Sequence, residues 1–530
     1  MVNVSFLQEL LNGIAERGRT LLPRSLAGLD ADDELVDLVR ALVSGRGEAS
    51  GVALARQILA SYGALDAPRR HSFFAFLADN LGPDTEAVRA AAMAFVAQAT
   101  PETYRGLARA VEAPRQEFFR RLNLAPGATA AIVAMRRDML EALPTNSKLA
   151  DVDADLMHLL SSWFNRGFLV LRRIDWSTPA NILEKIIAYE AVHEIQGWDD
   201  LRRRLDPSDR RCFAFFHPSL LDEPLIFVEV ALTREIPGSI QDLLSDEMPG
   251  TTAATTRKAG ATSGTQTTAV FYSISNCQEG LRGISFGNFL IKQVVEELAR
   301  ETPSLKTFVT LSPAPGFAAW LAAQLARPEH DLLSRKDRAV LQVLQDPSWA
   351  DEPDADLESG SEDHEEIKHL ILALAAHYFL EARAANGRTP DPVARFHLGN
   401  GARLERINWR ADLSQKGVRE AHGLMVNYLY ELKDIEKNHE TFADTGAVTA
   451  SRAVRVLLRR LDKARVDVKA ATSTPPSEKS RAEVLALEAP EVPARKAGKA
   501  NPGPASPRQD EPAQPARPTA PRPGKDAAKS

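Results

Sequence analysis

Residues 269–300 read AVFYSISNCQEGLRGISFGNFLIKQVVEELAR, and this stretch decides the fold class. Its first part, Ala269–Ser275, is rich in aromatic and β-branched residues, which is typical of a strand. A glycine-rich turn follows, and apolar residues then recur at helical spacing from Asn288 to Arg300. The stretch therefore predicts a strand, a turn and a helix in a mixed α/β layer. The helix should bury Leu290, Val294 and Leu298.

The turn between this strand and helix is a candidate phosphate site. The first N–H groups of a helix have no partner within it and lie at the positive end of its dipole, where phosphates bind. Gly280, Gly283 and Gly287 let the backbone approach a ligand closely, and Arg282 adds a positive charge. The spacing matches neither a P-loop nor the G-x-G-x-x-G dinucleotide pattern. From spacing alone, a turn that needs its glycines only for geometry is equally well supported.

Helical and extended patterns occupy different parts of the chain around this unit. Residues 1–205 show helical periodicity and predict an all-helical N-terminal domain. Residues 206–465 alternate between strands and helices, so the predicted fold class is α+β. The strands are expected at 212–216, 225–232, 269–275, 307–311 and 424–429, with a hairpin in 392–409 around Gly399-Asn400-Gly401 and helices at 288–300, 369–384 and 448–461.

Three segments have compositions that argue against a packed core. Residues 237–268 are rich in Gly, Thr, Ala and Ser, and residues 351–366 hold nine carboxylates. Within the tail 466–530, the last 60 residues contain 12 of the 33 prolines and no aromatic residue. We expect two mobile insertions in the second domain and a disordered C-terminal tail, because such segments bury too little apolar surface to order themselves.

Composition narrows the class of protein. The 65 Lys and Arg residues against 71 Asp and Glu give a net charge of −6, which argues against a nucleic-acid partner. Two cysteines, Cys212 and Cys277, exclude a disulfide framework and a cysteine-based zinc site. No apolar run reaches the roughly 18 residues of a membrane span, and the N-terminus lacks the pattern of a secretory signal. We therefore expect a cytoplasmic protein with no membrane partner.

Two polar residues are candidates for catalysis. Ser312 directly follows a predicted strand, in a turn stiffened by Pro313 and Pro315, but it lacks the G-x-S-x-G pattern of a hydrolase nucleophile. His397 is predicted to end a strand beside a tight turn, and its reference pKa near neutrality suits a proton donor. The alternatives are a serine that bonds its own turn and a histidine buried in the core, and His217 is a second candidate donor. The histidine spacings predict no metal site.

Four long segments together resemble the malonyl-CoA decarboxylase family. They occur in the family's order and extend over roughly residues 180–465, which makes them more specific than any single glycine pattern. The helical first part is also compatible in size with the family's N-terminal domain. The segments are FFHPSLLDEPLIFVEVALT (215–233), VFYSISNCQEGLRGISFGNFLIKQVVEEL (270–298), LSPAPGFAAWL (311–321) and FHLGNGARLERINWRADLSQKGVREAHGLMVNYLY (396–430).

The resemblance implies a helical N-terminal domain and a catalytic domain related to the GNAT acetyltransferase fold. It also implies a homo-tetramer formed through the helical domain, and malonyl-CoA and acetyl-CoA as ligands. The family's serine and catalytic histidine correspond to Ser312 and His397. Where the family often has a glutamate in the glycine turn, this chain has Ser285. The implied substrate contacts are Arg282, Gly283, Ile284, Ser285, Phe286, Gly287, Asn288, Ser312, His397 and Tyr430.

The implied activity is decarboxylation of malonyl-CoA to acetyl-CoA and CO2. The thioester can accept the electrons of the broken bond, so the chemistry requires no metal or organic cofactor. Arg282 and the turn would hold the CoA phosphates, Ser312 would orient the malonyl group, and His397 would donate the proton. Two other functions fit the same CoA site: a GNAT-type acyltransferase and a non-catalytic acyl-CoA sensor.

Overall fold

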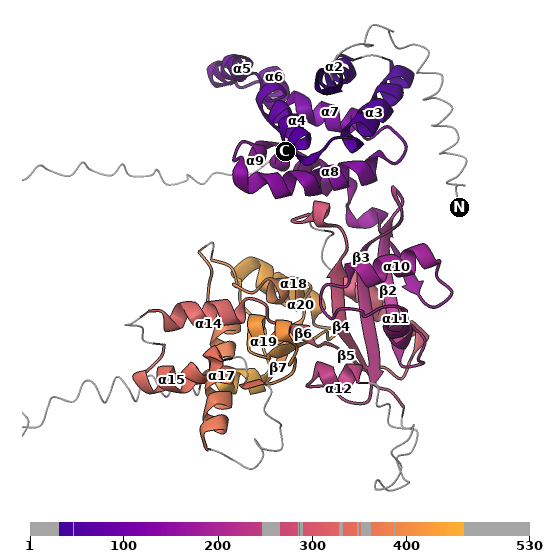
Figure 1. Cartoon of the computed structure of the whole chain (residues 1–530). Coiled ribbons are helices and arrows are strands. Elements are labelled where there is room, and N and C mark those ends of the chain that lie inside the picture. Colours follow the sequence, from indigo (N-terminus) through magenta and orange to yellow (C-terminus); the bar gives the residue numbers. More distant parts are fainter. Residues whose placement is uncertain are drawn as a thin grey trace, which may run out of the picture. The chain divides into compact units, whose positions relative to one another are not determined.

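The computed structural model describes residues 31–45, 47–245, 265–284, 286, 290–327, 332–346, 349–350, 362–385 and 387–459 (Figure 1). The predicted tail, 466–530, lies outside these residues, and so do 246–264 and 351–361 of the two predicted insertions. The described part opens with helices, as the sequence predicts. They are α2 (Ala31–Val43), α3 (Glu48–Gly63), α4 (Ala67–Asn80), α5 (Thr85–Ala97), α6 (Pro101–Val111), α7 (Pro114–Leu122), α8 (Ala128–Ala142) and α9 (Leu149–Trp163).

Local signals explain where several of these helices begin. Asp66 accepts a hydrogen bond from the Arg69 N–H at the start of α4, and Asp84 caps α5 in the same way. Most of the helices then bury an apolar stripe that includes Phe73, Phe118 and Leu122. The exception is the pair α5 and α6, whose described residues include none that is buried. These two helices pack on each other and leave an apolar face open.

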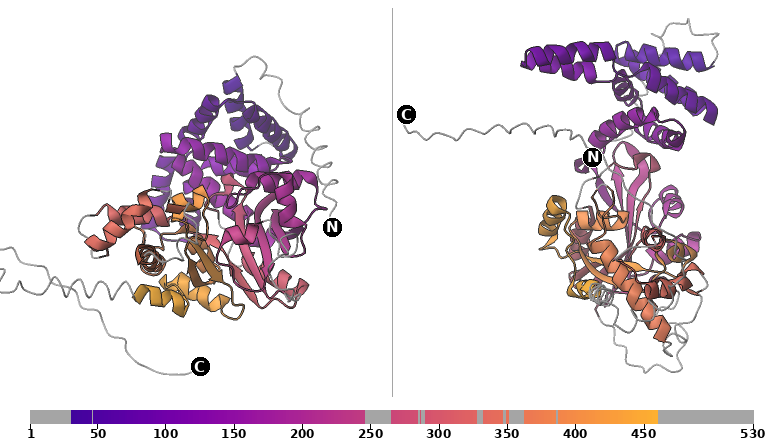
Figure 2. Two further views of the ribbon diagram at one scale, coloured as in Figure 1. Left: turned by 60° about the horizontal axis from the view of Figure 1, so that its bottom comes forward. Right: turned by 90° about the vertical axis from the view of Figure 1, so that its left-hand side faces the viewer.

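A mixed sheet follows the helical part. Its strand order is β1-β2-β3-β4-β5-β8-β6, and β7 also pairs with β8. Only β4 and β5 are parallel among the pairs described, and helix α13 (Leu290–Glu301) connects them. Figure 2 shows the long strands side by side, in magenta. The strands are β1 (Val170–Ile174), β2 (Arg210–His217), β3 (Leu220–Thr233), β4 (Thr268–Asn276), β5 (Thr307–Thr310), β6 (Ser312–Pro313), β7 (Arg403–Asn408) and β8 (Met425–Leu429).

The order of elements confirms the predicted fold class, a helical N-terminal region followed by a mixed α/β sheet domain. The predicted strand and helix of 269–300 appear as β4 and α13, and a short 3-10 helix at Glu279–Leu281 lies between them in the sequence. Helices α10 (Ala180–Tyr189) and α11 (Trp198–Leu205) cover β2 and β3, as Figure 1 shows. The remaining helices are α12 (Ile240–Leu244), α14 (Phe317–Leu325), α15 (Arg335–Val340), α17 (Glu362–Leu380), α18 (Pro392–Gly399), α19 (Gln415–Ala421), α20 (Ile435–Thr445) and a helix over 452–459.

Two predictions of local structure are wrong. The expected helix-only region includes a strand, because Val170–Ile174 pairs antiparallel with β2 from Val170↔Phe216 to Ile174↔Cys212. The expected hairpin of 392–409 is a helix followed by one strand. Asp391 caps α18 and Pro392 occupies its first turn, a start signal that outweighs the local apolar pattern.

The insertions are shorter than predicted within the described residues. Helix α12 lies inside the first insertion, where Ser239 caps it by accepting from the Asp242 N–H. At the other end of this insertion, Thr268 already belongs to β4. The second insertion overlaps the first turn of α17, which begins at Glu362. Composition therefore overestimates the length of both insertions, because their ends belong to α12, β4 and α17.

Candidate active site

Ser312, His397 and Tyr430 come together although they lie on three separate elements. Ser312 Oγ lies 3.0 Å from His397 Nε2, and Tyr430 Oη lies 2.8 Å from His397 Nδ1. Strand β6 places Ser312 opposite Val426 of β8, and Tyr430 follows the last residue of β8. His397 reaches both from the last turn of α18. The structure thus assembles three of the predicted site residues into one hydrogen-bonded set.

Burial changes the acid–base character of the histidine. His397 is 2% exposed, and its ring stacks on Tyr428 with 4.7 Å between the ring centroids. Burial lowers the pKa of His397 to about 3, because the charged ring would lose its hydration. The pKa of His397 therefore lies well below its reference value near neutrality, and the ring is neutral at pH 7.

Asp391 joins the serine segment to the histidine helix. Its carboxylate accepts from the Ala394 N–H (2.8 Å) at the start of α18 and from the Gly316 N–H (3.3 Å), four residues after Ser312. Tyr378 Oη donates a third bond, at 3.3 Å. A Cβ at Gly316 would overlap the Tyr378 hydroxyl, so this position requires glycine. One buried carboxylate thereby fixes the distance between the two segments.

The glycine turn is held by the helical region. Arg136 of α8 is buried and donates to the carbonyls of Gly280 (2.7 Å) and Arg282 (2.9 Å), while its Nε pairs with Asp153 (2.7 Å). A Cβ at Gly280 would overlap the Val133 carbonyl of α8. The need for glycine at this position is therefore explained by packing rather than by a ligand.

The other predicted residues of the turn are only partly described. Gly283 has φ +84°, which favours glycine, and Ile284 and Phe286 are buried. Ser285, Gly287 and Asn288 lie outside the described residues. Arg282 lines a groove of about 440 Å³ against α8, together with Arg137, Glu141 and Glu279. The two arginines face two glutamates, so the side chains of this groove carry no net charge.

His217, the second candidate donor, lies in a different environment. Its ring packs on Phe164, with 4.8 Å between centroids, and Nδ1 accepts from the Ser219 N–H at 3.1 Å. These contacts are those of a structural histidine. Sequence reasoning missed Thr310 and Asp391, which contact the Ser312 and His397 segments. The only available signal was the Asp391-Pro392 helix start.

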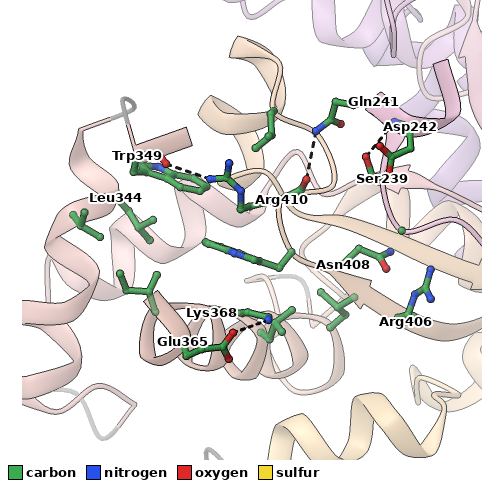
Figure 3. Close-up of a pocket in the computed structure, with 17 residues that line it drawn as sticks. Ser239, Gln241, Asp242, Leu344, Trp349, Glu365, Lys368, Arg406, Asn408 and Arg410 are labelled. Carbon is green, nitrogen blue, oxygen red and sulfur yellow. Dashed lines mark hydrogen bonds and ion pairs between the residues drawn. The ribbon is translucent and has the colours of Figure 1, made fainter. Parts of the chain in front are cut away.

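A separate pocket of about 770 Å³ opens beside β7 (Figure 3). Arg406 and Asn408 line it from β7, and Lys368 lines it from α17, where it pairs with Glu365. Trp349 stacks on Trp409 at 5.2 Å, and Arg410 lies over the Trp349 ring. Ser312, His397 and Tyr430 do not line this pocket.

No group of three histidine, cysteine or acidic side chains within the described residues could hold a metal ion. None of the helices over the same residues is long and apolar enough to cross a membrane.

The fold and the site define a mixed α/β protein whose site resembles that of an enzyme. Its serine, histidine and tyrosine side chains are uncharged and hydrogen-bonded to one another. Residues 167–468 match the malonyl-CoA decarboxylase C-terminal domain, and residues 81–164 match the malonyl-CoA decarboxylase N-terminal domain. The chain belongs to the malonyl-CoA decarboxylase family.

Individual relatives support this assignment. The protein named malonyl-CoA decarboxylase, mitochondrial, from Anser anser anser is 36% identical over 354 residues, 64% of this chain and 68% of that protein. The crystal structure of malonyl-CoA decarboxylase from Rhodopseudomonas palustris is 54% identical, with a TM-score of 0.74 over 81% of this chain and all of that one. The corresponding structure from Agrobacterium vitis is 52% identical, with a TM-score of 0.72 over 80% of this chain and 99% of that one.

Proposed function

We propose that this protein decarboxylates malonyl-CoA to acetyl-CoA and CO2. The observation that carries the proposal is the closed set of Ser312, His397 and Tyr430, found in a chain of this family. Asp391 accepts hydrogen bonds from the segment that follows Ser312 and from the helix that carries His397, and so holds the two together. Such a site can orient a substrate and supply a proton from one fixed direction.

The proposed reaction breaks the bond between the α-carbon and the carboxylate carbon of the malonyl group. The electron pair of that bond passes into the thioester and gives the enolate of acetyl-CoA, while CO2 leaves. In the complex, the Ser312 hydroxyl is proposed to turn from Thr310 to the malonyl group and to hold it so that the breaking bond overlaps the thioester π system. His397 then gives a proton to the α-carbon.

The neutral ring of His397 is sufficient for this last step. The α-carbon of a thioester enolate is a stronger base than a deprotonated imidazole, so proton transfer from a neutral ring is downhill. Tyr430, 2.8 Å from Nδ1, stabilises the charge that the ring then carries until it regains a proton from solvent. The burial that depresses the histidine pKa is therefore compatible with the proposed role.

The CoA phosphates are proposed to bind at the Arg282–Asn288 turn, before α13. The positive φ of Gly283 and the start of α13 support this placement. Arg282→Ala should raise the KM for malonyl-CoA about tenfold and change kcat less, because phosphate contacts are shared by the ground and transition states. Arg89→Ala, which removes an exposed arginine of α5, is the matched control. An unchanged KM with a reduced kcat would contradict the placement.

A direct assay tests the activity. Purified protein is incubated with malonyl-CoA and no acceptor, and acetyl-CoA and CO2 are measured. Formation of both products without an acceptor is the expected result. No turnover would overturn the proposal and leave the acyltransferase and the acyl-CoA sensor, which acetyl-CoA with an amine acceptor would then separate.

The helical region is proposed to form a homo-tetramer through the pair α5 and α6. Met93, Val96 and Tyr104 are 67%, 85% and 61% exposed, which is unusual for apolar side chains on an amphipathic helix pair. A second copy of the chain would cover this face. Val96→Asp should reduce the mass measured by light scattering, whereas Glu102→Gln on the same pair should leave it unchanged.

A reducing, cytoplasmic compartment is proposed for the protein. Cys212 and Cys277 are both buried and unpaired, which suits a setting without disulfide formation. The relative from Anser anser anser carries the word mitochondrial in its name, so the compartment should be tested by localising the tagged full-length chain.

A further inference from the structure

Thr310 is a buried hydroxyl that the proposed reaction does not use. It ends β5, two residues before Ser312, and none of its surface is exposed. Its Oγ1 accepts from Ser312 Oγ at 2.9 Å and from the Tyr428 N–H at 3.1 Å. We propose that Thr310 sets the tautomer of His397, by holding the Ser312 hydrogen away from the ring so that the ring proton sits on Nε2.

The hydrogens that these groups can donate decide the tautomer. A serine hydroxyl has one hydrogen to donate, and here the bond with Thr310 runs from Ser312 to Thr310. Ser312 Oγ can then only accept from His397, which requires a hydrogen on Nε2. Nδ1 is left with its lone pair, so Tyr430 Oη donates to it. All three contacts are then hydrogen bonds. Tyr430 donates to His397, His397 donates to Ser312, and Ser312 donates to Thr310.

The opposite tautomer breaks this order. If Nδ1 carried the hydrogen, Nε2 would have to accept the hydrogen of Ser312. The 2.9 Å contact between Ser312 and Thr310 would then have to run from Thr310 to Ser312, against the direction that its geometry supports, and the Tyr430 hydrogen would lose Nδ1 as its acceptor. The observed geometry therefore favours the Nε2–H form.

The surrounding strands hold Thr310 in its role as an acceptor. The Tyr428 N–H of β8 donates to the threonine side chain rather than to a main-chain carbonyl. The carbonyl of Thr310 instead accepts from Asn427 Nδ2 at 2.8 Å, and Asn427 is fully buried. Because both main-chain and side-chain oxygens of Thr310 are fixed by β8, its Oγ1 keeps a constant orientation toward Ser312.

This inference rests on the proposed function for its consequence, since Nε2–H is the proton that reaches the substrate. The tautomer itself is a property of the free protein. Thr310 is accordingly a positioning residue that acts through Ser312. Removing its acceptor should let Ser312 donate to His397 and move the ring hydrogen to Nδ1, the wrong side for proton donation.

The test compares Thr310→Val, which keeps the shape and removes the acceptor, with Thr310→Ser, which keeps the acceptor. ¹⁵N NMR of histidine-labelled full-length protein reports which ring nitrogen is protonated, and a His397→Asn sample identifies the His397 signals. Wild-type protein and Thr310→Ser should show protonated Nε2, and Thr310→Val should show protonated Nδ1. The kcat of Thr310→Val should fall at least about tenfold with KM little changed, because a positioned acid contributes about 10²–10⁴-fold.

Each result decides a separate point. A wild-type spectrum with protonated Nδ1 would overturn the inference even if Thr310→Val failed to fold. Protonated Nε2 in a folded Thr310→Val would overturn it as well. A shifted tautomer with unchanged decarboxylation would support the role of Thr310 in setting the tautomer and overturn His397 as the donor. Absence of decarboxylation in the wild type would overturn the proposed function and leave the NMR result standing.

Discussion

Two buried polar networks lie in the same sheet domain and differ in charge. The network at the candidate active site is a chain of neutral groups, Tyr430, His397, Ser312 and Thr310, in which each contact can be a hydrogen bond. The second network surrounds Glu229 in the middle of β3 and is ionic. Arg204 of α11 donates to Glu229 at 3.2 Å and also pairs with Asp200, on the face of the sheet that α11 covers.

The ionic network is less completely satisfied. Glu190 accepts from the hydroxyls of Ser273 and Ser275, and Arg204 also donates to the His193 carbonyl. Yet among the described residues Glu229 Oε1, His193 Nε2 and Tyr272 Oη are buried without a hydrogen-bond partner. Burial penalises charge in both places, lowering the pKa of His397 to about 3 and, together with Glu190, raising that of Glu229 to about 8. Each of the four neutral groups has a hydrogen-bond partner, although Tyr428 Oη beside the His397 ring has none among the described residues, whereas the ionic network leaves a carboxyl oxygen of its central residue, Glu229, unpaired. We therefore expect the first network to control turnover and the second to control stability.

Breaking the neutral network at its centre should have the largest effect. His397→Asn removes the proton donor while the buried site keeps a polar side chain. We expect kcat to fall by about 10²–10⁴-fold, the usual contribution of a general acid, with malonyl-CoA binding retained. Steady-state kinetics and a binding measurement with malonyl-CoA would separate the two quantities.

His422→Asn is the matched control for this variant. His422 is also a partly buried histidine, but its φ of +49° is well tolerated by asparagine, and its ring packs beside Phe317 rather than Ser312. It should retain near-wild-type turnover. If His397→Asn behaved like this control, His397 would not be the donor.

Breaking the ionic network should lower stability instead. Arg204→Met removes the cation that pairs with Asp200 and donates to Glu229, which should cost about 3–5 kcal/mol in the free energy of unfolding at about pH 9, where Glu229 is ionised. The kcat of the folded fraction should stay close to wild type. Urea unfolding and active-site-normalised kinetics would measure the two effects.

A double variant sharpens this result. Arg204→Met with Glu229→Gln also removes the carboxylate that the first change exposes to an apolar surrounding, so part of the lost stability should return. A large loss of kcat in folded Arg204→Met would show that the two networks are coupled and that the proposed division is wrong.

The sequence predicted much of the second domain but not the contacts that hold its site. The strand, turn and helix of 269–300 carry their own periodicity and turn glycines, so local reasoning was enough. Ser312 and His397 are candidates from their places in the sequence, and the family resemblance adds Tyr430. Their proximity depends on β6 pairing with β8, and no local pattern encodes that pairing.

The wrong hairpin prediction has a physical cause. Gly399-Asn400-Gly401 looks like a hairpin turn, yet Asn400 ends α18 and Gly401 has φ +81° against the Ile435 carbonyl, which would overlap a Cβ. A helix C-terminus and a hairpin need the same residues, so only the structure on both sides distinguishes them. The role of Arg136 could not be predicted from local sequence either, because Gly280, which accepts its hydrogen bond, lies 144 residues further along the chain.

The ionic network should also make stability depend on pH. The pKa of Glu229 rises from its ordinary value of 4.5 to about 8 in the folded protein, so between these pH values the native state binds more protons than the unfolded state. The free energy of unfolding should therefore fall as pH rises through this window. Glu229→Gln should flatten the slope between about pH 6.5 and about pH 8.5, a range above the titration of His397. Unfolding curves with equal slopes for the variant and the wild type would refute the assignment.

The smallest expected effect is the effect of pH on the neutral network. The kcat/KM should not change near pH 6.5, the ordinary pKa of a histidine. Because the pKa of His397 is about 3 in the free protein, the ring is already neutral at pH 5 and above, and no ionisation of His397 occurs in the assay range. If the neutral ring donates the proton, kcat/KM has no inflection from His397 between about pH 5.5 and about pH 7.5. A donor that must first take up a proton with the substrate would instead make kcat/KM fall about tenfold for each unit of rising pH. Measuring kcat/KM for malonyl-CoA across this range distinguishes the two cases, and a tenfold fall per unit would show that His397 acts as an imidazolium.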